Sequence, residues 1–366
     1  MLSPAAAPLA WLDAFAASGD AVRRLPGRRL CVADAKAGRA ILHNDDRAFV
    51  EHSDFFTTRS GIFAPRAAQI AMGRDVRSLL SEGLARADVD TALAELDRRS
   101  VWPAAGCRLI AGLSMDLLAG PARDPAFRAL LGEIVRVRIL DRGVRRPNLL
   151  RGLVRKRLFF AAFARERRSF DPDAPRNDAL ASVFAHGGTA NDAQLAEVYL
   201  GFVFSLVSSA GLTLAWTVKL AVGAGKTQAP PDRLVSEALR LFPIAWWMAR
   251  RPAGAFDLLG ERVTARDIVI VSPYAIHRNP AYWPEPTQYL PERWGEGADR
   301  SAWLPFGAGP HSCIAMRLTF HLLERILGGL FGGLSGGNWT IEDSGGGAMI
   351  GAALAPAPFT LIRLPR

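Results

Sequence analysis

The stretch Phe306-Gly-Ala-Gly-Pro-His-Ser-Cys313-Ile-Ala-Met-Arg317 places two glycines and a proline directly before one cysteine. Apolar residues at helical spacing follow from Met316 to Leu327, so Cys313 is expected between a tight loop and a helix. Free backbone N–H groups and the helix dipole favour a thiolate there, and the glycines let a flat group approach the main chain. The stretch suits a thiolate ligand of a planar cofactor such as haem. Taken alone, it fits an incidental cysteine in a glycine-rich loop equally well.

Length and composition fit an ordinary globular protein. The chain has 366 residues, enough for one large core or two domains, and 49% of them are hydrophobic. Three cysteines (Cys31, Cys107 and Cys313) argue against a disulfide framework and fit a reducing compartment. No secretory leader is recognisable, and the longest apolar run, Val198 to Val207, is too short for a membrane span. We therefore expect a cytoplasmic protein with no membrane span.

The formal net charge of +10 points to an acidic partner. The basic residues are dispersed apart from a denser, amphipathic stretch from Arg136 to Arg168, which is interpreted as a solvated helix face. No basic helix with interleaved aromatic residues and no zinc-finger spacing is present, so nucleic acid is not expected as a partner.

The predicted fold class is mainly α with small β-sheets. Residues 20–43 are expected to form a small β unit followed by a helix, and residues 75–168 to be helical almost throughout. Residues 193–222 form the longest apolar helical candidate, expected to run through the core, with a cluster of small polar residues from Ser205 to Thr213. A strand is expected at Ile244–Met248 and a glycine-rich hairpin from Leu330 to Leu364.

In order and spacing, the C-terminal elements resemble the cytochrome P450 family. The loop matches the haem signature of that family through Phe306, Gly309, His311, Cys313 and Ala315. Its Glu-x-x-Arg motif is matched by Glu237-Ala-Leu-Arg240, and the third member of that buried triad by Arg293. The resemblance implies the cytochrome P450 fold in a single domain over residues 1–366, with a shortened N-terminus and a shortened segment 218–231.

The resemblance also implies a cofactor and residue roles. The cofactor would be haem b (iron protoporphyrin IX), with Cys313 as the axial thiolate that favours O–O cleavage. Glu237, Arg240 and Arg293 would hold the cysteine loop, although a Glu and an Arg three residues apart are more often a weak surface pair. The haem propionates would bind His311, together with Arg250 or Arg251, and with Arg77 as a further candidate.

The sequence departs from the family in the central helix. Counting back from Leu214-Ala-Trp places Ser208 where the family usually has an acid and Ser209 where it has an alcohol. No carboxylate lies between Glu197 and Asp232, and serine is a poor acid at neutral pH, so the usual proton relay is weakened. Ala315 stands where glycine is more common.

Three functions remain open at this point. One is a haem-thiolate monooxygenase or oxidase of specialised metabolism with an atypical relay; another is a haem-thiolate enzyme that uses peroxide, or that couples, dehydrates or rearranges its substrate. The last is a non-catalytic partner of a biosynthetic enzyme, which the retained cysteine loop argues against. The basic chain fits an acidic ferredoxin-type electron donor, or a small-molecule substrate bound to an acidic carrier protein. Substrate-facing residues are expected in Phe55–Pro65 and on the Val203–Gly211 face.

Overall fold

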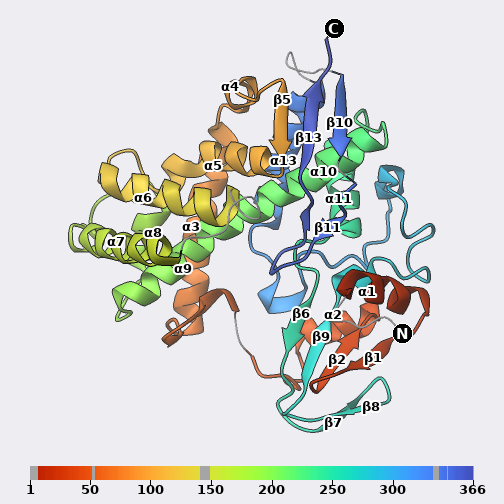
Figure 1. Ribbon diagram of the computed structural model, residues 1–366. Coiled ribbons are helices and arrows are strands. Elements are labelled where there is room, and N and C mark those ends of the chain that lie inside the picture. The colour runs from red at the N-terminus through yellow and green to blue at the C-terminus, as the bar shows by residue number, and fades with distance from the viewer. Residues whose placement is uncertain (1–6, 52–53, 141–148, 333–337, 344, 366) are drawn as a thin grey trace. The chain divides into compact units, whose positions relative to one another are not determined.

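The computed structural model describes residues 7–51, 54–140, 149–332, 338–343 and 345–365 (Figure 1). The chain divides into two compact units, each assembled from separated segments. The sheet unit comprises Met1–His52, Trp216–Cys313 and Gly347–Pro356, and the helical unit comprises Ser53–Ala215, Ile314–Gly346 and Ala357–Arg366.

The sheet unit is built on a sheet with strand order β1-β2-β9-β6. Strands β2 and β9 are parallel and the other neighbours are antiparallel; in the register, Leu30 of β2 lies opposite Val269 of β9. Leu30, Cys31 and Val32 are all buried, as expected for a strand covered on both faces. The strands and helices of this unit are α1 (Pro8–Ala17), β1 (Val22–Leu25), β2 (Arg29–Val32), α2 (Ala35–His43), α11 (Pro231–Leu241), β6 (Met248–Arg250), β7 (Phe256–Leu258), β8 (Glu261–Val263), β9 (Ile268–Val271), α12 (Pro273–Ile276), η4 (Pro291–Trp294), η5 (Gly309–His311), β11 (Ala348–Met349) and β12 (Ala355–Pro356).

The predicted helix after β2 is confirmed as α2, and its ends are capped by side chains typical of those positions. Asp34 accepts a hydrogen bond from the Ala37 N–H at the N-terminus. Asn44 adopts a left-handed conformation with φ 57° at the C-terminus. The two caps fix where α2 begins and where it ends. The C-terminal end matters because the cysteine loop packs on it.

The helical unit holds most of the long helices and a small antiparallel sheet, β10-β13-β5. Its elements are η1 (Asp54–Phe56), β3 (Thr57–Thr58), β4 (Gly61–Ile62), α3 (Arg66–Arg86), α4 (Val89–Ala94), β5 (Arg99–Trp102), α5 (Ala104–Leu118), α6 (Pro125–Val135), η2 (Arg136–Leu140), α7 (Leu149–Arg168), α8 (Ala179–Ala185), α9 (Asp192–Phe204), η3 (Ser205–Ala210), α10 (Gly211–Gly223), α13 (Met316–Gly332), β10 (Trp339–Asp343) and β13 (Phe359–Arg363). The boundary between the units falls within α10.

Three expectations about the elements need correction. Residues 75–168 are interrupted by β5, in which Ser100 and Trp102 are buried while Arg99 and Val101 are exposed, and this period of two pairs it with β13. The strand expected at Ile244–Met248 begins only at Met248, because the preceding segment bonds elsewhere: the Ile244 carbonyl accepts from Leu354 N and the Trp246 indole donates to Gly351 O. The C-terminal hairpin is β10 with β13, and α13 continues to Gly332.

The long central helix runs from α9 through η3 to α10, close to its expected bounds. Its middle, Ser205–Ala210, is π-helical, which widens one turn of the helix. Thr213 Oγ1 donates to the Ser209 carbonyl at 2.8 Å, the back-bonding expected of a small polar residue in a buried helix. The stretch Asp192–Gly223 is long and apolar enough to cross a membrane, and 61% of its apolar window is buried in the structure, as in the core helix of a globular fold.

Candidate functional site

The cysteine loop, residues 306–313, lies in the sheet unit, and a backbone hydrogen bond joins its two ends. The Cys313 N–H donates to the Phe306 carbonyl at 2.9 Å, and Gly307 and Gly309 take φ values of +73° and +70°. Those left-handed conformations favour glycine. Cys313 ends this loop as an exposed residue, three residues before α13 begins at Met316.

Close packing on α2 explains why Gly309 has no side chain. A Cβ on Gly309 would lie 2.7 Å from the Cα of His43 and 2.9 Å from the carbonyl oxygen of Leu42. Both are backbone atoms at the end of α2 and cannot move aside as a flexible side chain would. On the other side of the loop, a Cβ on Gly307 would be 3.4 Å from the sulfur of Met248 on β6. The position of the loop is therefore set by α2 and β6.

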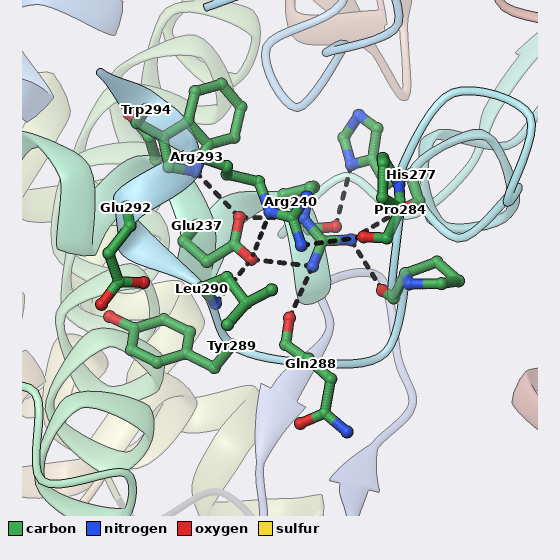
Figure 2. A network of polar contacts seen from close by, with 12 residues as sticks. Glu237, Arg240, His277, Pro284, Gln288, Tyr289, Leu290, Glu292, Arg293 and Trp294 are labelled. Carbon is green, nitrogen blue, oxygen red and sulfur yellow. Dashed lines mark hydrogen bonds and ion pairs between the residues drawn. The ribbon is translucent and has the colours of Figure 1, made fainter.

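Figure 2 shows the polar network centred on Glu237 of α11. Arg240 donates two hydrogen bonds of 2.8 Å to the carboxylate, and Arg293 Nε donates another of 3.1 Å. Both Glu237 and Arg240 are fully buried, so this is not the weak surface pair that their spacing alone would indicate. The structure brings all three residues of the expected triad together.

The rest of the network consists of groups that a motif search does not reveal. Glu237 also accepts from the Trp294 indole at 2.8 Å and the Leu290 N–H at 3.0 Å. The remaining Arg240 donors reach the backbone carbonyls of His277, Pro286 and Gln288. Every strong donor and acceptor is thereby satisfied, the condition under which buried charges are tolerated.

His277 connects this network to the start of the cysteine loop. Its Nδ1 lies 3.0 Å from the Arg240 carbonyl oxygen, and its Nε2 accepts from the Leu304 N–H at 2.8 Å. Burial and the neighbouring Arg240 lower the pKa of His277 to about 3. The ring is therefore neutral at physiological pH. No motif named above includes His277, and the signal that could have found it is its place in the stretch His277-Arg-Asn-Pro.

The basic residues predicted to bind the haem propionates are divided between the two units: His311, Arg250 and Arg251 belong to the sheet unit, and Arg77 belongs to the helical unit. His311, half-buried, has Nε2 3.5 Å from the Glu51 carboxylate, an acidic neighbour that sequence reasoning missed. The segment of Glu51 is held next to Arg251, because Val50 N donates to the Arg251 carbonyl at 2.8 Å. Arg250 is half-buried on β6 and Arg251 is exposed. The sheet unit therefore collects His311, Arg250 and Arg251 on segments that adjoin one another.

Arg77, Ala315 and the two serines lie in the helical unit. Arg77 is exposed on α3, one turn after Gly73, and a Cβ on Gly73 would face the Ile314 side chain at 3.7 Å. Ser208 and Ser209 are half-buried in the π-helical turn. The nearest preceding carboxylate on this helix, Glu197, accepts from Arg59 N at 2.9 Å. The π-helical turn of the central helix therefore carries two hydroxyl groups and no carboxylate.

The described residues fit a haem bound through one thiolate. Cys313 is exposed, whereas Cys31 and Cys107 are 2% exposed and burial raises both thiol pKa values to about 12. A single exposed thiol on a loop packed against α2 would suit a cofactor that needs one thiolate ligand. Among the residues that the structure describes, no group of three or more His, Cys, Asp or Glu could hold a metal ion without such a cofactor.

Comparison with known proteins gives two kinds of similarity. The family model described as Cytochrome P450 matches residues 232–330. Cyclooctatin synthase of Streptomyces melanosporofaciens is 30% identical over 175 residues, which are 39% of this chain and 38% of that protein. Thromboxane-A synthase of Sus scrofa is 38% identical over 91 residues, 24% of this chain and 17% of that protein. The chain thus matches well under half the length of these relatives.

Solved structures match over nearly the whole chain but at low identity. A post-tailoring hydroxylase, HmtN, involved in himastatin biosynthesis covers 100% of both chains, with a TM-score of 0.65 and 16% identity. A structure described under unusual cytochrome P450-like monooxygenases involved in microbial secondary metabolism covers 97% of both, with a TM-score of 0.69 and 15% identity. At such identity the likeness establishes the fold, which is mainly helical with small sheets.

Proposed function

Because the chain belongs to the cytochrome P450 family, we propose that it is a haem-thiolate oxidoreductase, a monooxygenase or oxidase that acts on a small specialised metabolite. The observation that carries the proposal is Cys313, exposed at the end of a loop whose position is set by buried charges and tight backbone contacts. A scaffold protein has no need of such a ligand. Structural neighbours named for microbial secondary metabolism and for himastatin biosynthesis support the substrate class.

In this proposal the sheet unit supplies most of the groups that hold haem b. Cys313 would supply the sulfur ligand, and His311 together with Arg250 or Arg251 would supply positive charge for the propionates, with Arg77 as a further candidate. When bound, the haem supplies the oxidising chemistry, and a thiolate ligand favours O–O cleavage. Glu237, Arg240, Arg293 and His277 act at a distance from the cofactor, by fixing the backbone that carries Cys313.

The proton path is assigned to the hydroxyl groups of the central helix. Ser208 and Ser209 lie in the widened turn, and the Ser209 carbonyl is already bonded by Thr213. A serine hydroxyl passes a proton without itself being an acid, so the proton originates from solvent or substrate. Replacing Ser209 by Ala should then lower the product formed per electron consumed, and unchanged coupling would remove Ser209 from the path.

The lack of a carboxylate between Glu197 and Asp232 favours a second candidate function. An enzyme that uses peroxide, or that couples, dehydrates or rearranges its substrate, has less need of an acid in this helix. The two candidates differ in their requirement for electrons. Turnover with peroxide and no reductant would select the second candidate, and turnover that depends on a reductase chain would select the first.

The proposal extends to partners and location. An acidic ferredoxin-type donor fits the net charge of +10, as does a substrate carried by an acidic protein, and a cytoplasmic location fits both. Reduction of the haem that slows with increasing ionic strength would support an electrostatic donor.

The deciding experiment is the absorption spectrum of the purified protein, first oxidised and then reduced in the presence of CO. The expected result is the strongly red-shifted Soret band of a haem-thiolate complex, which Cys313→Ala should abolish. A wild-type band in Cys313→Ala would overturn the ligand assignment. A folded protein that does not retain haem would instead support a partner-protein function.

A further inference from the structure

Three aromatic side chains of the sheet unit form a continuous path from the Glu237 network to the cysteine loop. The ring centroids of Trp294 and Trp303 lie 5.4 Å apart, and those of Trp303 and Phe306 lie 5.9 Å apart. The rings of these pairs meet at 61° and 70°, close to the edge-to-face arrangement that aromatic rings favour. We call these three residues the aromatic chain. Both tryptophans are buried, and the function proposed for the protein gives neither of them a role.

A hydrogen bond fixes each end of the aromatic chain. At one end, the Trp294 indole donates to the Glu237 carboxylate at 2.8 Å (Figure 2). At the other end, the Phe306 carbonyl accepts from the Cys313 N–H at 2.9 Å. Trp303 lies between these ends and contacts the rings of both neighbours. A shift of the Trp303 indole would therefore be passed to the residue that closes the cysteine loop.

The Trp303 indole is oriented by helix α11. Its Nε1 donates to the carbonyl of Ser236 at 3.3 Å, and Ser236 directly precedes Glu237 in the chain. One turn of α11 thus carries both the carboxylate that binds Trp294 and the carbonyl that binds Trp303. A buried indole N–H without a partner costs free energy, so the hydrogen bond favours this orientation of the ring over others.

The backbone around Trp303 is held independently of its ring. Arg39 of α2 donates to the carbonyls of Arg300 and Trp303 at 2.7 and 3.3 Å. His277 holds the next residue, accepting from the Leu304 N–H at 2.8 Å. Truncation of the Trp303 side chain should therefore leave the segment attached to α2 and to the buried network. What it removes is the contact between that network and the phenyl ring at the start of the cysteine loop.

We propose that Trp303 is a positioning residue for the Cys313 ligand, acting through Phe306, whose carbonyl closes the loop. The loop contains two glycines with left-handed backbone angles, and glycine has more backbone freedom than any other residue. A packed ring at the point of closure restricts that freedom and so fixes where the sulfur lies. The inference rests on the proposed function, because it concerns the residue that would bind the haem iron.

The alternative is that Trp303 only fills space in the core, and Tyr289 provides the comparison. Tyr289 is 9% exposed, as is Trp303. Its hydroxyl also donates to a backbone carbonyl of α11, that of Leu234, at 3.2 Å. Among the described residues, however, no aromatic ring contact joins Tyr289 to the cysteine loop. Truncation of either side chain should lower stability, but only truncation of Trp303 should disturb the loop.

The first test is amide hydrogen exchange of the full-length, haem-free protein, followed by mass spectrometry of the peptide that contains Cys313. Trp303→Leu should speed exchange of the Cys313 amide by about tenfold, because two aromatic contacts are lost. Trp303→Phe retains a ring but not the hydrogen bond to Ser236, so its exchange rate should be closer to that of the wild type. Tyr289→Leu, the matched control, should leave this amide unchanged. Circular dichroism of every variant establishes that it is folded.

The second test is the CO spectrum of the reduced, haem-loaded variants at equal haem content. Trp303→Leu should lower the share of the red-shifted Soret band, Trp303→Phe should restore most of it, and Tyr289→Leu should retain it. Wild-type exchange at Cys313 in Trp303→Leu would overturn the proposal, and so would equal acceleration in Tyr289→Leu. Wild-type protein without the red-shifted band would count against the proposed function instead, and exchange in the haem-free protein would then decide alone whether Trp303 fixes the loop.

Discussion

The imidazole of His277 accepts a hydrogen bond from the backbone N–H of Leu304 at 2.8 Å, and so ties the cysteine loop to the buried network of α11. An imidazole accepts only at an unprotonated nitrogen, so Nε2 is the acceptor and Nδ1 donates to the Arg240 carbonyl. Protonation would convert the acceptor into a second donor facing the Leu304 N–H. The loop that carries Cys313 is therefore sensitive to the charge on one histidine.

The first prediction concerns the pH dependence of stability. The pKa of His277 falls from 6.5 in the unfolded chain to about 3 in the fold, so below pH 6.5 the unfolded chain takes up a proton that the native protein does not. This contribution to the free energy of unfolding is complete above pH 6.5 and is lost as the pH falls towards 3. At pH 5 the loss should be on the order of 2 kcal/mol. Urea unfolding at pH 7.5 and pH 5 measures it. His277→Gln should be less stable at pH 7.5 yet lose less on acidification, and an unchanged pH dependence in this variant would contradict the assignment.

The second prediction separates buried from exposed ion pairs. Glu237→Gln leaves Arg240 buried without a countercharge and should lower the free energy of unfolding by about 3–5 kcal/mol. Arg262→Ala breaks an exposed pair with Asp257 at 3.5 Å and should change it by less than about 0.5 kcal/mol. Urea titrations followed by tryptophan fluorescence compare the two variants. Similar losses in both would mean that the Glu237 network does not carry the stability assigned to it.

The third prediction tests the packing of the cysteine loop on α2. Gly309→Ala introduces a Cβ at 2.7 Å from the His43 Cα and at a φ of +70°, so the loop must shift away from α2. We expect lower retention of haem on gel filtration and a lower melting temperature. The control is Gly254→Ala in the same unit, where a Cβ meets no heavy atom within 4 Å. Equal haem retention by both variants would show that the packing on α2 does not hold the loop.

The fourth prediction concerns thiol reactivity in the haem-free protein. Cys31 and Cys107 are buried with pKa values raised to about 12, so at pH 8 they are protonated and shielded, whereas Cys313 is exposed. A thiol reagent should label one of the three cysteines rapidly in the native protein and all three after unfolding. Loading with haem should protect the rapid thiol. Rapid labelling that persists in Cys313→Ser would assign it to another residue.

The sequence was most informative where local chemistry decides the structure. The cysteine loop, the helix of Glu237 and Arg240, and the capped helix α2 depend on glycine conformations, helical spacing and capping side chains, and each lies where it was expected. Strand β5 was missed because its four residues gain their strand character from pairing with β13, more than 250 residues away. The strand expected at Ile244 starts late for a similar reason, since the Ile244 carbonyl accepts from the Leu354 N–H and the Trp246 indole donates to the Gly351 carbonyl.

The site shows the same division between local and long-range information. Glu237, Arg240 and Arg293 were identified from motifs, but their burial was not visible in the spacing. Glu51 was missed altogether, because it reaches His311 through the pairing of its segment with Arg251. That pairing follows from the way the whole sheet unit folds.

The π-helical turn Ser205–Ala210 has a geometric consequence for the central helix. A π turn holds about one residue more than an α turn, so the faces of the helix before and after it are out of phase by roughly 100°. Before the turn, Phe202 packs against Phe55 with ring centroids 4.7 Å apart. After it, Gly211 faces the sulfur and backbone of Cys107 on α5. One extra residue thus rotates the contact surface of Gly211 relative to that of Phe202, by comparison with a regular α-helix of the same sequence length.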